Sequence, residues 1–85
     1  MNSSQSQSPK LEALQLEHSI YAVLYKAAFG IRWRASDKYE SAMVKVEQDT
    51  FALDPCACAL MHQARVTLRC QLHLQLVRAK EQVRL

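Results

Sequence analysis

The stretch RVTLRCQLHLQLV, residues 65–77, alternates polar and apolar side chains with few exceptions. Alternation with a period of two is typical of a half-buried β-strand. The composition favours a helix, because Leu, Gln and Arg are good helix formers and only Val66, Thr67 and Val77 are β-branched. A strand of this length would also exceed the usual five or six residues by about twofold. We therefore predict a helix and keep a strand as the alternative.

On a helix this alternation becomes two separate apolar rows. The longer row contains Met61, Leu68, Leu72, Leu76, Ala79 and Val83. The second row contains Val66, Cys70, Leu74 and Val77. One row can pack against the rest of the chain, but a second row needs another neighbour. Large exposed apolar patches mark interaction sites, so the second row predicts association.

The first helix is predicted from its capping residues. Ser8 is a typical N-cap, Pro9 suits the first helical position, and Gly30 is a natural C-terminal stop. Apolar residues cover two sides of this helix, and we expect both sides to be buried. The second of these sides contains Leu16, Ile20, Val23 and Ala27.

Two further helices follow the connector IRWRAS at residues 31–36. Asp37 and Glu40 have the spacing of a capping box and open a helix that we expect to reach Gln48, followed by a loop over 49–53. Its solvent-facing side is predicted to carry Lys38, Glu40, Lys45 and Glu47. Asp54 and Pro55 repeat the N-cap signal, and the third helix runs from there toward Val83.

The composition fits one small helical domain. The chain has 85 residues, of which 49% are hydrophobic, with one Gly and two Pro, too few for the turns of a β-meander. We expect a disordered polar tail over 1–8 and a single domain over 9–85. The predicted fold is all-α: an antiparallel pair of long helices with a short helix between them in sequence. Dimerisation or binding of a partner would complete the bundle.

The compartment is inferred from cysteine usage and from targeting signals. Three cysteines are too few, and odd in number, for a secreted disulfide scaffold. The start MNSSQSQS lacks a charged residue and an apolar core, and no apolar run of about 18 residues is present to span a bilayer. We expect a soluble cytoplasmic protein.

The function predicted from these patterns is protein–protein association, as in a small adaptor, regulator or co-chaperone. The partner would be a second copy of the chain or another helical protein. We expect neither enzymatic activity nor a cofactor, a membrane or a small-molecule substrate. The predicted interface consists of Leu16, Ile20, Val23, Val66, Cys70, Leu74 and Val77.

Binding of duplex RNA is the alternative. Residues 56–85 hold five basic side chains and one acidic one, and a basic row along a helix can follow phosphates by shape. A solvated helix face explains the same pattern. The residues of this alternative are Arg32, Arg34, His62, Arg65, Arg69, His73, Lys80 and Arg84.

Other chemistry-bearing side chains have simpler interpretations. Cys56, Cys58 and His62 lack a fourth ligand and the usual C-x-x-C spacing, so we predict no metal site and leave a redox role open. His18 has no evident nucleophile beside it, and we expect it to be hydrogen-bonded at the edge of the core. Trp33 is expected to close the end of the bundle, with a base or a partner as its alternative contact.

Overall fold

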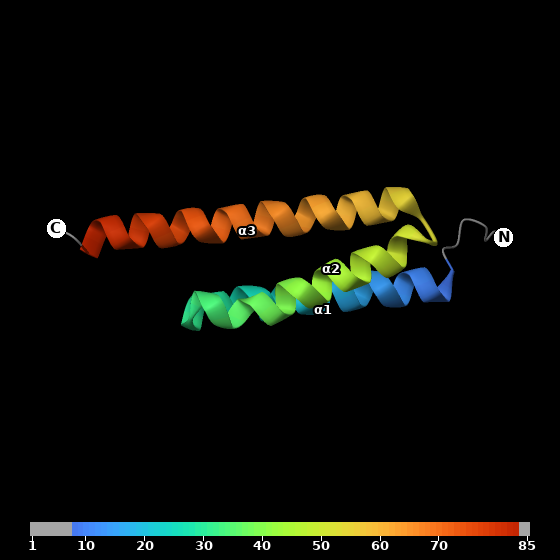
Figure 1. Ribbon diagram of the computed structural model, residues 1–85, viewed down its shortest axis with the longest axis horizontal. Coiled ribbons are helices and arrows are strands. Elements are labelled where there is room, and N and C mark those ends of the chain that lie inside the picture. Colours follow the sequence, from blue (N-terminus) through green and yellow to red (C-terminus); the bar gives the residue numbers. More distant parts are fainter. Residues whose placement is uncertain (1–7, 84–85) are drawn as a thin grey trace.

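A computed structural model describes residues 8–83 of the chain, which form three α-helices and one short 3₁₀ turn (Figure 1). The elements are α1 (Pro9–Ile31), η1 (Trp33–Ser36), α2 (Asp37–Phe51) and α3 (Pro55–Val83). The all-α prediction is therefore confirmed, and residues 65–77 lie within α3 as a helix. The predicted tail over 1–8, apart from Ser8, lies outside the described residues. The described part is elongated, with extents of 60 × 18 × 18 Å.

Two of the predicted helix starts are confirmed by their hydrogen bonds. The Ser8 side chain accepts a hydrogen bond from the backbone N–H of Leu11 at 3.1 Å. Asp54 Oδ1 accepts from the backbone N–H groups of Cys56 at 3.0 Å and Ala57 at 3.2 Å. These bonds satisfy donors that have no partner within a helix, so they fix where α1 and α3 begin.

Other predicted boundaries are wrong. Gly30 lies inside α1 without a positive φ, and Arg32 is the C-cap residue. The second helix continues past Gln48 to Phe51, so most of the predicted loop is helical. Asp37 forms no capping box, because Ser36 is the N-cap residue and makes no side-chain cap hydrogen bond. The predicted capping box is absent because the 3₁₀ turn η1 leads directly into α2.

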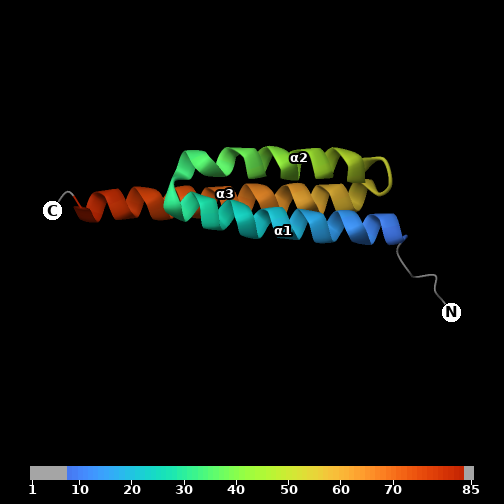
Figure 2. The same ribbon diagram turned by 90° about the horizontal axis from the view of Figure 1, so that it is seen from below.

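The two long helices run in the same direction, which corrects the predicted antiparallel pair. His18 on α1 and Arg65 on α3 both contact Glu47, whereas Phe29, further along α1, packs against His73, further along α3. Figures 1 and 2 show α2 running in the opposite direction alongside both. The reason is the length of α2: its 15 residues span about 22 Å, so the chain reverses direction twice.

The core lies where the three helices meet. Tyr25, Phe29, Met43 and Leu72 form a buried cluster, with the rings of Tyr25 and Phe29 6.1 Å apart. The longer apolar row of α3, which we call the inner row, packs here in part: Leu72 is buried and Leu68 and Leu76 are partly buried in the cluster. Met61 is buried nearer the start of α3, whereas Ala79 is exposed. Within residues 8–83, no helix is both long and apolar enough to cross a membrane.

Candidate functional site

A buried carboxylate joins the three helices. Glu47 on α2 is only 4% exposed, although the sequence pattern placed it on the solvent side of its helix. Its Oε2 accepts hydrogen bonds from His18 Nε2 on α1 at 2.9 Å and from Arg65 Nε on α3 at 2.8 Å. An ionised carboxylate has no proton to donate, so His18 carries a proton on Nε2. The prediction that His18 is hydrogen-bonded at the core is confirmed.

Arg65 uses its remaining donors on two further groups. Its Nη1 donates to Glu40 Oε2 at 3.0 Å, and its Nη2 donates to His62 Nδ1 at 3.0 Å. Arg69 Nε lies 3.8 Å from the same Glu40 oxygen. Among the described side chains, no buried nitrogen or oxygen lacks a hydrogen-bond partner. The buried charges are therefore compensated, which such charges require.

The network sets the charge states of its members. Burial alone would raise the pKa of Glu47, but the hydrogen bonds from Arg65 and His18 outweigh burial and hold this pKa below its usual value. Burial alone would lower the pKa of Arg65, but its hydrogen bond and charge interaction with Glu47 raise this pKa overall. Both partners are thus ionised at neutral pH, which is the state that holds α2 against α3.

The basic residues of the nucleic-acid alternative do not form one free row. Arg65 is 9% exposed and occupied by Glu47 and Glu40. His73 packs edge-on against Phe29, with ring centroids 5.0 Å apart, and it also lies against Trp33. Arg84 lies outside the described residues. Of the remaining residues, Arg32, Arg34, His62, Arg69 and Lys80 are exposed.

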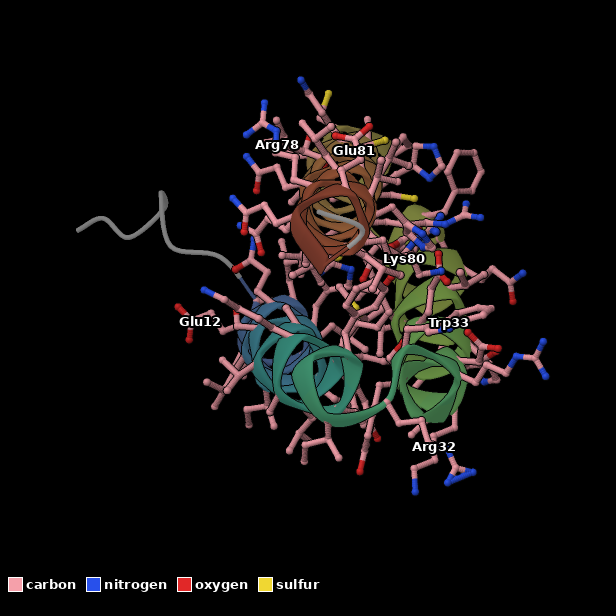
Figure 3. All side chains as sticks on the ribbon, turned by 90° about the vertical axis from the view of Figure 1, so that its left-hand side faces the viewer. Glu12, Arg32, Trp33, Arg78, Lys80 and Glu81 are labelled. Atoms are coloured by element: carbon pink, nitrogen blue, oxygen red, sulfur yellow. The ribbon has the colours of Figure 1, made fainter. Side chains whose placement is uncertain are left out.

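Figure 3 views the bundle from the end at which α3 terminates. Arg32 lies at the edge opposite Arg78, so these two cations face different sides of the molecule. Arg34 is held over the Trp33 ring, with its Cζ 5.1 Å from the ring centroid. Trp33 in turn lies 6.3 Å from the His73 ring and, although 39% exposed, covers the end of the bundle. This placement agrees with the interpretation of Trp33 as an end residue.

The outer side of α1 is apolar and exposed. Leu16, Ile20 and Val23 are 63%, 50% and 68% exposed. At 100° per residue they lie roughly 140–200° around the helix from His18, which faces the core. The expectation that both apolar sides of the first helix are buried is therefore wrong for the single chain: three helices enclose only the side that faces their common axis.

The outer side of α3 carries the second apolar row, which we call the α3 outer row: Val66, Cys70, Leu74 and Val77. All four side chains are exposed, Leu74 by 50% and Val77 by 51%. They lie roughly 120–200° from the buried Leu72. Because α1 and α3 each point their outer side away from the shared core, the apolar row of α1 and the α3 outer row lie on separate sides of the bundle.

A groove that the sequence did not predict lies between α2 and α3. Its volume is about 630 Å³, within the range of about 300–1,000 Å³ seen for ligand pockets, and its walls are mostly apolar. The lining residues are Val44, Glu47, Gln48, Phe51, Pro55, Cys58, Ala59, His62 and Arg65. Phe51 is the last residue of α2, which extends further than predicted, and it lines this groove with 60% of its surface exposed. The groove was not predicted because residues 49–53, which include Phe51, were expected to form a loop.

The three cysteines are free thiols on α3. Cys56 and Cys70 are exposed, and Cys58 is partly exposed in the groove wall. Within the described residues, no group of three or more His, Cys, Asp or Glu side chains is arranged to hold a metal ion.

Comparison of the chain with protein-family models, with curated proteins and with solved structures found no match.

Proposed function

We propose that this protein is a helical protein–protein interaction module that associates through the α3 outer row. The observation that carries the proposal is the exposure of this row in a chain that buries, fully or in part, Met61, Leu68, Leu72 and Leu76 on the other side of the same helix. Burial of apolar surface is favourable by about 25 cal/mol per Å², so another helix packed against Leu74 and Val77 would gain free energy that the isolated chain cannot.

The row also has the spacing that helix packing requires. Steps of four, four and three residues separate Val66, Cys70, Leu74 and Val77, which keeps them on one side of a helix. The apolar row of α1 offers a second surface on the other side of the bundle, where it can contact a further helical partner.

The experiment compares the mass in solution of the wild-type chain, Leu74→Asp and Gln75→Asp by light scattering. Gln75 is the matched control, because it is exposed on α3 and lies about 100° around the helix from Leu74. We expect a wild-type mass above the 9.7 kDa of one chain, a return toward 9.7 kDa for Leu74→Asp, and no change for Gln75→Asp. Equal masses for the wild type and Leu74→Asp would contradict the proposal, provided that circular dichroism shows both chains folded.

Binding of duplex RNA receives less support from the side chains. With Arg65 buried and His73 packed against aromatic rings, phosphate contacts of the described α3 residues in this set would rest on His62, Arg69 and Lys80. A gel shift at low salt tests this alternative, since binding through phosphates is strongest there. A lack of complex under that condition excludes it.

A further inference from the structure

The last turns of α3 extend beyond the other helices (Figures 1 and 2). Leu76 is the last α3 residue packed against the core cluster, and His73 meets Phe29 and Trp33 at the end of α1. Residues 77–82 are all exposed. We call this segment the α3 overhang. It spans about 9 Å of helix, and helical turns without a packing partner are marginal in water.

The groove between α2 and α3 lies toward the opposite end of α3, and the α3 outer row leads into it. Pro55, Cys58, Ala59, His62 and Arg65 form the α3 wall of the groove. Ala59 precedes Val66 by seven residues, which places the two on the same side of the helix. Groove, outer row and overhang therefore form one surface along α3.

A two-fold axis next to Cys70 would bring the outer row, the overhang and the groove of two copies into contact. If α3 of a second copy lies antiparallel on the outer row, Cys70 meets Cys70 and Leu74 meets Val66 of the other copy. In the same register the overhang lies opposite residues 58–63, of which Cys58, Ala59 and His62 line the groove. One operation thus covers the outer row, the overhang and the groove of both copies, as an isologous interface requires.

The charges favour this direction over a parallel pair. The overhang carries two basic residues, Arg78 and Lys80, and one acidic residue, Glu81, so its net charge is +1. Asp49 lies near the C-terminal end of α2, 3.4 Å from Lys45 of the same helix, and Asp54 caps the start of α3. Antiparallel helices place Arg78 and Lys80 of each copy near Asp49 and Asp54 of the other, whereas parallel helices would place the two overhangs together.

We propose that the occupant of this surface is a second copy of the chain, with the two α3 helices antiparallel about Cys70 and each overhang seated in the other copy's α2–α3 groove. This inference rests on the proposed function and names its partner.

Cysteine cross-linking tests the register. In a full-length background with Cys56, Cys58 and Cys70 replaced by Ser, Val66→Cys and Leu74→Cys are prepared separately and oxidised with diamide, alone and mixed. We expect a disulfide-linked dimer in the mixture but not from Val66→Cys alone, because Val66 faces Leu74 of the other copy. The chain that retains Cys70 as its one cysteine should also form a disulfide-linked dimer.

A Val66→Cys chain that cross-links to itself as well as the mixture does would overturn the antiparallel register. If light scattering shows association but the mixture gives no cross-link, this inference fails while the proposed function stands. A wild-type mass of 9.7 kDa contradicts both.

Exchanging the charges at positions 80 and 49 tests whether the overhang of one copy lies in the groove of the other. We expect Lys80→Glu and Asp49→Lys each to weaken dimerisation by about two- to fivefold, the range of exposed ion pairs. Combining the two changes in one chain should restore wild-type affinity, because each interface then contains the opposite pair. Additive weakening in the double variant would overturn this placement of the overhang.

Discussion

Glu47 on α2 and Arg65 on α3 form a buried ion pair, in which Arg65 Nε donates to Glu47 Oε2 at 2.8 Å. The same carboxylate oxygen accepts from His18 on α1 at 2.9 Å. One side chain of the middle helix therefore contacts both long helices. Loss of one partner from a buried pair leaves the other charge without compensation, so this contact should matter more than exposed ion pairs do.

Glu47→Gln should destabilise the folded chain by about 1.5–3 kcal/mol, the range for a lost hydrogen bond to a charged group. Urea unfolding at fixed protein concentration measures this change. Glu17→Gln is the matched control, because Glu17 is exposed on α1, and its effect should stay within about 0.5 kcal/mol. Equal stabilities for the two variants would contradict the role given to Glu47.

The stability of the fold should fall on acidification. Burial raises the pKa of Glu47, but the hydrogen bonds from Arg65 and His18 lower this pKa by more than burial raises it. The pKa of Glu47 in the folded chain therefore lies below its value in the unfolded chain. The stabilisation is then fully present above the unfolded pKa, about 4.5, and is lost as pH falls through the folded pKa. Urea midpoints between pH 7 and pH 3 measure this, and Glu47→Gln should show a shallower loss. Parallel profiles for the two proteins would show that Glu47 is not responsible.

Gly30→Ala should stabilise the chain. Gly30 lies within α1 without a positive φ, and a Cβ built there has no heavy atom within 4 Å. Alanine in a helix interior is favoured over glycine by about 0.5–1 kcal/mol. A higher melting temperature in circular dichroism would agree with this placement, whereas a lower one would indicate that Gly30 terminates the helix after all.

Asp54→Ala should remove the N-cap of α3. Asp54 Oδ1 accepts from two backbone N–H groups, at 3.0 and 3.2 Å, and loss of such a cap costs about 1 kcal/mol. Asp54→Asn keeps an acceptor at the same position and should retain most of the stability. Thermal unfolding of both variants measures the difference. If Asn proved as damaging as Ala, the charge of Asp54 would matter more than its hydrogen bonds.

The features that the sequence predicted are those governed by neighbouring residues. The caps at Ser8 and Asp54 act within one turn, and the residue preferences that made 65–77 helical are local. The inner row of α3 was also predictable, because a helix fixes which of its residues share a side.

The features that the sequence missed depend on more than one helix. Glu47 follows Met43 by four residues and Glu40 by seven, so these three lie on one side of α2, next to the core. That spacing, together with Arg65 and His18 elsewhere in the chain, was a signal for a buried ion pair. The direction of the long helices depends on two reversals of the chain, at η1 and at residues 52–54, which bring α3 parallel to α1.

The central claim is that the outer side of α3 is an interface, and the mass of the unmodified full-length chain tests it most directly. Sedimentation velocity over a wide concentration range should show a species of twice 9.7 kDa that dissociates on dilution. A mass of 9.7 kDa at every concentration, for a chain that circular dichroism shows to be helical, would contradict the account.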